Sequence, residues 1–207
     1  MRIVFFGDSV TEADRNKEDP CDLGPGYVRT AAELLLKRFP DVPFVFFNRG
    51  ISGNRAIDLF NRLQKDCLDL HPDIVVLLVG VNDSMHRTND VYHYSSNGSF
   101  RQYYESLLKI LKENGVRIVM MEPFCLTNPN LNYFRFDLLP KIDIVRELAM
   151  AYADRFVVLD GPLWADAMEN GVFHLTNDGV HPNGEGRKWL GGKAADAISS
   201  LIGKNEI

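Results

Sequence analysis

The 207-residue sequence predicts an α/β protein in which helices cover both faces of a parallel β-sheet. Short apolar runs alternate with longer amphipathic segments about five times along the chain, which is typical of repeated strand–helix units. Residues 74–79 are apolar throughout, as expected for a strand that is buried on both faces. Polar, glycine-containing segments follow the first three runs, at the sheet edge where parallel sheets bind ligands.

The elements can be assigned in order from these patterns. Runs rich in β-branched and aromatic residues predict strands at 3–6, 44–47, 74–79, 116–121 and 156–159. Helical spacing of apolar residues predicts helices at 27–39, over 57–67, from about 99 to 115, and at 142–152, 162–168 and 185–202. Ser99 and Gln102 have the spacing of a capping box, and Gly115 is expected to end that helix. Residues 11–22 and 124–136 are expected to form loops.

Composition restricts the classes of protein that fit. The net charge of −5 and the lack of a Lys/Arg block disfavour a nucleic-acid partner. The longest apolar run is too short to span a bilayer, and no signal peptide precedes Ser9, so we expect a cytoplasmic protein without a membrane partner. Three scattered cysteines favour reduced, structural thiols. No repeat or linker is evident, so residues 1–207 are expected to form one domain.

Three residues could together make an activated nucleophile. Ser9 follows the first predicted strand in a glycine-containing turn, which places its hydroxyl at the sheet edge. A serine needs a base to take its proton, and a histidine such as His181 has a suitable pKa near neutral pH. Asp178 precedes His181 by three residues and could hold the other ring nitrogen. We therefore expect Ser9, Asp178 and His181 to be catalytic.

An acyl-transfer site also needs donors for the oxyanion of its tetrahedral intermediate. The candidates are the backbone N–H groups of Ser9 and Gly53 and the side-chain amide of Asn82. Each has a purely structural alternative, because an asparagine can cap a turn and a glycine can supply a positive φ. Asp178 and His181 could likewise belong to a turn before a helix. Asp8 and Asp83 are expected to brace loops rather than perform chemistry.

Four segments resemble the sequence blocks of the SGNH (GDSL) hydrolases, in the family's order and along the whole chain. They are Gly7-Asp8-Ser9-Val10-Thr11, Ile51-Ser52-Gly53-Asn54, Gly80-Val81-Asn82-Asp83 and Asp178-Gly179-Val180-His181-Pro182. The resemblance implies a three-layer, flavodoxin-like α/β/α fold with a five-stranded parallel sheet. It also implies a Ser9–His181–Asp178 triad and an oxyanion hole formed by Ser9, Gly53 and Asn82. One such block is a weak signal, whereas the four together are specific.

Within that family, a narrower resemblance points to the intracellular acetylxylan esterases and other carbohydrate deacetylases. It is carried by Gly26-Tyr27-Val28, by residues 48–54 and by Pro123-Phe124. Two positions depart from that subgroup, since Gly179 stands in place of an arginine and Asn177 in place of an aromatic residue. The resemblance implies an esterase that removes acetyl groups from soluble carbohydrates, such as acetylated xylo-oligosaccharides, with no cofactor and no metal.

The expected substrate is thus a small ester, and a homo-oligomer is left open. Asn54, Arg55 and His86 follow the oxyanion candidates, and their polar side chains are expected to contact substrate hydroxyls. The main alternative is a lysophospholipase or thioesterase with an apolar acyl groove, built from Phe124, Leu126, Leu131, Tyr133 and Phe134. A metal-dependent phosphoesterase using Asp8, Asp83, Asp178 and His181 is disfavoured, because no spacing among them suggests a ligand pair.

Overall fold

The computed structural model of the chain describes residues 1–85, 95–126 and 132–202. Its centre is a five-stranded sheet in the order β2-β1-β3-β4-β5, with every neighbouring pair parallel. The strands are β1 (Arg2–Gly7), β2 (Val45–Gly50), β3 (Ile74–Leu78), β4 (Arg117–Met121) and β5 (Arg155–Val157). This order, with β1 between β2 and β3, is that of the flavodoxin-like folds, as predicted.

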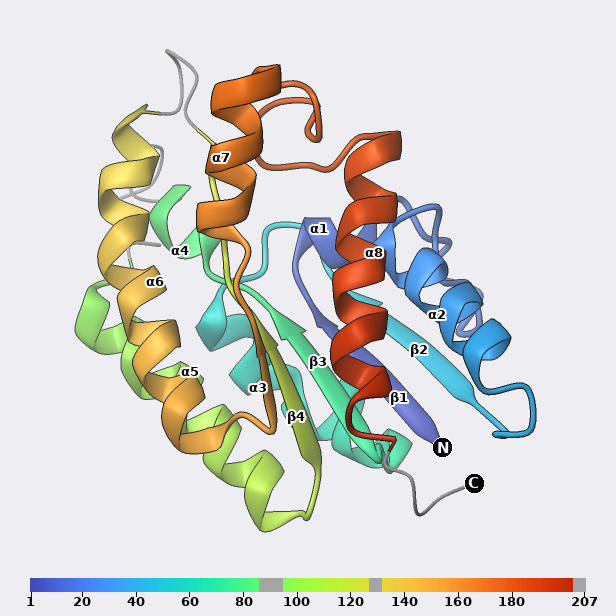
Figure 1. Cartoon of the computed structure of the whole chain (residues 1–207). Helices are drawn as coiled ribbons and strands as arrows, with labels where there is room; N and C mark the ends of the chain where they lie inside the picture. The colour runs from blue at the N-terminus through green and yellow to red at the C-terminus, as the bar shows by residue number, and fades with distance from the viewer. Residues whose placement is uncertain (86–94, 127–131, 203–207) are drawn as a thin grey trace.

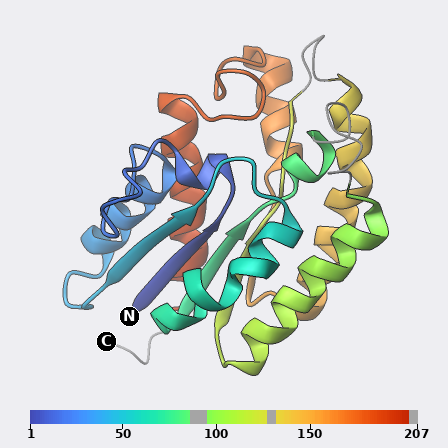
Figure 2. The same cartoon turned by 180° about the vertical axis from the view of Figure 1, so that it is seen from behind.

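Helices lie on both faces of the sheet (Figures 1 and 2). One face is covered by α2 (Tyr27–Arg38), α7 (Asp160–Asn170) and α8 (Gly184–Ser199), and the other by α3 (Ala56–Asp66), α5 (Asn97–Glu113) and α6 (Asn132–Tyr152). Alternation along β1 separates the two cores: Ile3 and Phe5 pack with the first group, and Val4 and Phe6 with the second. All four side chains are fully buried, which fixes the position of the strand that leads to Ser9.

The described part of the chain also contains three short helices, namely α1 (Ser9–Glu12), η1 (Leu68–Leu70) and α4 (Val81–Met85). Two of them, α1 and α4, follow β1 and β3 at the carboxyl edge of the sheet, where the sequence patterns indicated only turns or a loop. The connection from β1 leads toward β2 on one side, and the chain crosses back to place β3 on the other. A crevice opens at such a switch point in doubly wound sheets, and Ser9 and Asn82 stand on its two sides.

Two predicted helix starts were wrong. Helix α5 is capped by Ser96, whose hydroxyl accepts from the Ser99 amide, so Ser99 lies inside the helix instead of starting a capping box with Gln102. Helix α6 starts at residue 132, ten residues earlier than predicted, and continues through Pro140. The proline has no N–H to donate to the carbonyl of Phe136, four residues earlier, so the regular helical hydrogen bond is missing there. Within the described residues, no helix is long and apolar enough to cross a bilayer.

Candidate active site

Ser9 stands at the first position of α1, separated from the end of β1 only by Asp8. The Asp8 carboxylate caps this short helix by accepting a hydrogen bond from the Val10 amide (3.0 Å). Gly7 has no room for a side chain, because a Cβ would lie 2.4 Å from both the Leu78 carbonyl oxygen and the Thr11 hydroxyl. The close approach of β1 to β3 and the cap on α1 therefore fix where the Ser9 hydroxyl points.

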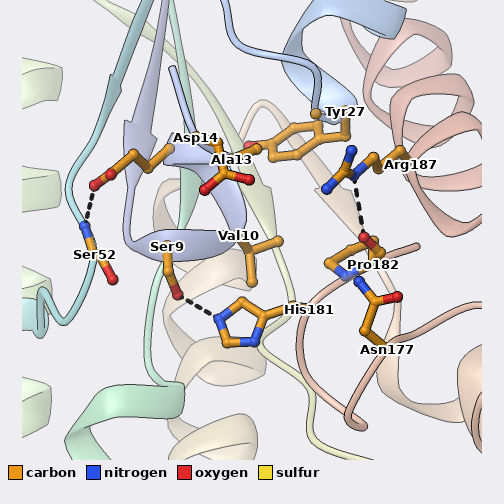
Figure 3. A pocket seen from close by; sticks show the side chains of 12 residues that line it. Ser9, Val10, Ala13, Asp14, Tyr27, Ser52, Asn177, His181, Pro182 and Arg187 are labelled. Carbon is orange, nitrogen blue, oxygen red and sulfur yellow. Dashed lines mark hydrogen bonds between the residues drawn. The ribbon is translucent and has the colours of Figure 1, made fainter. Parts of the chain in front are cut away.

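The structure brings the three predicted catalytic residues together in one hydrogen-bonded series. Ser9 Oγ lies 2.9 Å from Nε2 of His181, and Nδ1 of the same ring lies 2.6 Å from Oδ2 of Asp178. An ionised carboxylate only accepts hydrogen bonds, so Nδ1 carries the ring hydrogen and Nε2 is left to accept from the serine hydroxyl. Figure 3 shows the Ser9 hydroxyl directed at the His181 ring. The arrangement has the geometry of a nucleophile, a base and an orienting carboxylate.

The same contacts shift the pKa values of Asp178 and His181. Partial burial works to raise the pKa of Asp178, but hydrogen bonds from the His181 ring and from the His181 and Val180 amides outweigh it and lower the pKa to about 2. The hydrogen bond to Asp178 raises the pKa of His181 above its usual value of 6.5, against the opposing effect of burial. Asp178 is therefore ionised at neutral pH, and His181 is a stronger base than a free imidazole.

The loop that carries Asp178 and His181 is held at several points. Asp178 Oδ1 accepts from the backbone amides of His181 (2.7 Å) and Val180 (2.9 Å). The carbonyl of Gly179 accepts from the amide of Leu126, in the segment after β4. Gly179 has a φ of +96°, a conformation that favours glycine, so this residue lets the chain turn tightly between acid and base. Asp178 and His181 are thus fixed relative to one another by their own backbone.

The oxyanion candidates come from segments that bond to one another. The amide of Asn54 donates to the carbonyl of Ile51 (3.2 Å), and Gly53, with a φ of +80°, occupies the position of this turn that requires a positive φ. Asn82 is 9% exposed, and its Nδ2 donates to the carbonyl of Asn54 at 3.1 Å. A side-chain amide has two hydrogens, and this bond uses one of them. The turn and Asn82 therefore form one connected unit beside Ser9.

A cavity of about 320 Å³ opens next to Ser9 and His181 (Figure 3). Its polar lining includes Glu12, Asp14, Asn177 and Arg187, and the other lining residues are Val10, Ala13, Gly26, Tyr27, Ser52 and Pro182. Glu12 is fixed there by the Ser52 amide and Lys17, and Arg187 donates to the Pro182 carbonyl. The cavity therefore presents charged and amide side chains next to a comparable extent of apolar surface.

A family model described as "GDSL-like Lipase/Acylhydrolase family" matches residues 5–189, which include Ser9, Gly53, Asn82, Asp178 and His181. The chain belongs to this family.

The curated relative and the solved structures agree with this membership. An acetylxylan esterase of Geobacillus stearothermophilus is 31% identical over 131 residues, a match that spans 59% of this chain and 59% of that protein. A candidate GDSL-like lipase of Parabacteroides merdae ATCC 43184 has a similar structure, with 29% identity, a TM-score of 0.85 and coverage of 96% of this chain and 95% of that chain. Axe2, an acetylxylan esterase of G. stearothermophilus, shares the fold at 24% identity, with a TM-score of 0.83 and coverage of 98% and 94%. The predicted family and fold are confirmed, and the matches support the predicted enzyme class, a carboxylic ester hydrolase.

Two of the three residues expected to bind substrate in this GDSL-like hydrolase, Asn54 and Arg55, lie elsewhere than in the cavity. Asn54 Oδ1 accepts from Nε of Arg62 (2.7 Å), and Arg55 pairs with Asp58 at the start of α3 (3.0 Å). Neither side chain lines the cavity beside Ser9. His86 lies outside the described residues. Substrate contact by these residues stays a prediction.

Other residues at the site were not singled out from the sequence. The cavity residues Glu12, Asp14 and Arg187 lie in segments that the motifs do not cover, and their shared position follows only from the fold. Asn48, fully buried on β2, donates to the carbonyls of Thr11 (2.7 Å) and Leu23 (2.9 Å). These bonds join β2 to α1 and to the segment that precedes α2. Asn48 follows the predicted strand 44–47 and begins the segment 48–54 that carries the narrower family resemblance, but no role was predicted for its side chain.

The two remaining acidic residues of the motifs brace the backbone, as expected. Burial raises the pKa of Asp8 to about 7, although its bond to the Val10 amide opposes the shift. Burial also raises the pKa of Asp83 to about 6, against hydrogen bonds from Ser95 and from the Ala56 amide that starts α3 (3.1 Å). Among the residues that the structure describes, no three His, Cys, Asp or Glu side chains are grouped as a metal site.

Proposed function

We propose that this protein is a serine esterase that removes short acyl groups, acetyl above all, from soluble carbohydrate esters. The observation that carries the proposal is the series Asp178–His181–Ser9, with contacts of 2.6 and 2.9 Å. A hydroxyl bonded to an oriented, basic imidazole is the arrangement that activates serine for acyl transfer. The curated acetylxylan esterase relative supports the choice of acyl group and alcohol.

The first half of the reaction forms an acyl-enzyme. Oγ of Ser9 attacks the carbonyl carbon of the ester while its proton passes to Nε2 of His181. The carbonyl π electrons move to oxygen, and the resulting oxyanion accepts hydrogen bonds from the Ser9 and Gly53 backbone N–H groups and the Asn82 amide. The carbonyl re-forms, the C–O bond to the alcohol breaks, and His181 returns the proton to the departing alcohol oxygen. Ionised Asp178 stabilises the imidazolium that exists between these transfers.

The second half repeats these steps with water. Nε2 of His181 takes a proton from the water as its oxygen attacks the acyl carbon, and a second oxyanion forms in the same place. Collapse of this intermediate breaks the bond to Ser9 Oγ, which recovers its proton from His181. A carboxylic acid leaves, and the enzyme is restored. Every proton and electron pair is accounted for by these residues and water, so the proposal requires no cofactor.

The cavity supports a polar alcohol group in preference to a lipid. Glu12, Asp14, Asn177 and Arg187 can exchange hydrogen bonds with sugar hydroxyls, whereas an alkyl chain would desolvate them without compensation. Asn177 adds an amide where an aromatic residue was expected. The lipolytic alternative named five groove residues, and two of them, Phe124 and Leu126, are 3% and 1% exposed and belong to the core. These two are therefore unavailable as a groove without rearrangement of the fold. Phe134 is partly exposed, whereas Leu131 and the side chain of Tyr133 lie outside the described part of the chain.

The test is a profile of acyl-chain length, combined with a substrate panel. Activity on p-nitrophenyl esters should be highest with acetyl and fall steeply from butyryl to octanoyl, and acetate should be released from acetylated xylo-oligosaccharides. Ser9→Ala should fold normally and be inactive in both assays, and an organophosphate should label wild-type Ser9 alone. A maximum at octanoyl or longer would favour the lipase or thioesterase, and activity in Ser9→Ala would refute the mechanism.

A further inference from the structure

Arg62 lies in α3, outside the four sequence motifs, yet its guanidinium reaches two of them. Nε donates to Asn54 Oδ1 (2.7 Å), Nη2 donates to the Gly7 carbonyl (3.0 Å), and Nη1 contacts Asp66 Oδ2 (3.2 Å). Its carbon Cζ lies 4.3 Å from the centre of the fully buried Phe6 ring in β1. All three nitrogens and the flat face of the group are therefore engaged at once.

The guanidinium is largely withdrawn from water. Its side chain is 14% exposed, and burial lowers the pKa of Arg62, while Asp66 opposes the shift. A charged group leaves water in this way only when fixed protein acceptors replace the lost hydration. The planar fork of arginine is suited to this role, because it holds several acceptors in one rigid geometry.

Two of the three acceptors of Arg62, the Gly7 carbonyl and the Asn54 side chain, also belong to hydrogen bonds that join the oxyanion segments. The Gly7 carbonyl accepts not only from Arg62 but also from the amide of Ile51, which begins the turn that contains Gly53. Asn54, at the end of that turn, is bonded through its side chain to Arg62 and through its carbonyl to Asn82. The Arg62 side chain is thus hydrogen-bonded both to β1, which precedes Ser9, and to the turn 51–54. Asn82 is hydrogen-bonded to the same turn.

We propose that Arg62 is a positioning residue that sets the spacing between the oxyanion donors of Ser9, Gly53 and Asn82. This inference rests on the serine esterase mechanism proposed above. Oxyanion donors act only when they are held in place before the charge develops, and small displacements reduce their effect. Arg62 does not touch the reacting atoms. It acts by keeping the turn 51–54 at a fixed distance from the start of α1.

The main experiment is the kinetics of Arg62→Met, which keeps much of the side-chain volume and removes the three donors. Hydrolysis of p-nitrophenyl acetate should show kcat about 10–100-fold lower with KM unchanged, less than the roughly 10²–10³-fold expected for removal of a donor in Asn82→Ala. Inhibition by 1,1,1-trifluoroacetone, which forms a tetrahedral adduct with the serine, should weaken by the same factor as kcat/KM falls. The acid limb of the pH profile should not move, because His181 is untouched.

Two further variants keep the test decisive if Arg62→Met folds poorly. Arg62→Lys retains the charge but cannot reach both acceptors, so it should recover stability and little of the lost kcat. Asn54→Ala removes the acceptor at the other end of one bond, and should lower kcat without raising KM. The double variant Arg62→Met/Asn54→Ala should lose less than the product of the two single effects, since both break the same contact.

The matched control is Arg2→Met. Arg2 also donates to a backbone carbonyl, that of Leu70 (2.5 Å), and lies over an aromatic ring, that of Phe47 (5.0 Å), but it is at the opposite end of β1. Its replacement should affect stability and leave kcat unchanged. Full activity in Arg62→Lys, a loss confined to KM, an unchanged inhibition constant or an equal loss in Arg2→Met would each overturn the inference. Failure of an organophosphate to label wild-type Ser9 would instead refute the proposed function.

Discussion

Replacement of Asp178 by asparagine should disable His181 by reversing its tautomer. Asp178 uses both oxygens: Oδ1 accepts from the His181 and Val180 backbone amides, and Oδ2 accepts from the His181 ring. An asparagine has a single acceptor oxygen. With that oxygen at the position of Oδ1, the two backbone bonds survive and the NH₂ group faces Nδ1. Nδ1 must then accept, which moves the ring hydrogen to Nε2 and leaves no base for Ser9.

The expected loss of activity follows from the hydrogen bonds that each orientation of the asparagine amide keeps or loses. The opposite amide orientation would keep the correct tautomer but lose the two backbone hydrogen bonds, at about 1 kcal/mol each. A preference of about 2 kcal/mol for the wrong tautomer corresponds to roughly a 30-fold loss of competent enzyme. Loss of the carboxylate charge beside the imidazolium lowers activity further. This second effect is limited, because the Asp178 side chain is 52% exposed and solvent screens part of its charge. We expect kcat/KM to fall by about 10²–10³-fold.

The assay combines kinetics on p-nitrophenyl acetate with ¹⁵N NMR of the histidine rings, which distinguishes the two tautomers. His174 provides an internal control, because its Nδ1 contacts Asp166 at 2.9 Å, and neither residue lines the cavity. Its resonances should be the same in wild type and Asp178→Asn, and Asp166→Asn should leave activity unchanged. Retention of the hydrogen on Nδ1 of His181, or of kcat/KM within about tenfold of wild type, would refute the reasoning.

Two further predictions concern pH and packing. Because the bond to Asp178 raises the pKa of His181 and the reaction needs the neutral ring, kcat/KM should fall as pH drops through a midpoint above 6.5; an acid limb centred at or below 6.5 would contradict this. In α8, Gly186→Ala should lower the free energy of unfolding by about 1–3 kcal/mol or more. The new Cβ would lie 1.8 Å from the carbonyl oxygen of Leu175, which is in the loop that leads to His181. The control is Gly192→Ala in the same helix, where a Cβ meets nothing within 4 Å. Stability is measured by urea unfolding. Equal stability of the two variants would show that the contact with the Leu175 carbonyl is unimportant.

The fold could be predicted because its main elements are encoded locally. The strand 74–79 and the stripe of Val28, Ala31 and Leu35 on α2 show their burial directly in the pattern of apolar residues. The start of α6 is not encoded in this way. Arg135 donates to both oxygens of Asp160, 25 residues away, at 2.7 and 2.9 Å. Such a tertiary ion pair stabilises a helical turn before Pro140 and leaves no periodic signal in the sequence.

The residues of the site likewise fall into those that the local sequence indicates and those that depend on tertiary contacts. Ser9, Asp178 and His181 could be singled out because their chemistry is specific and each follows a predictable element. Arg62 could not, because an arginine on a helix is common and its significance comes from acceptors in two distant segments. The expected substrate-binding residues illustrate the converse, since Asn54 and Arg55 follow the right turn but their side chains have partners in α3. Side-chain direction depends on packing that the sequence does not display.

The separation of the nucleophile and the base along the chain has a consequence for biosynthesis. Ser9 and His181 are 172 positions apart, and all five strands precede His181. The loop bearing the base is followed by α8, which packs against α2. A chain emerging from a ribosome therefore presents Ser9 and all five strands before it presents His181. Under the proposed mechanism, ester cleavage cannot begin until the chain has been synthesised at least as far as residue 181.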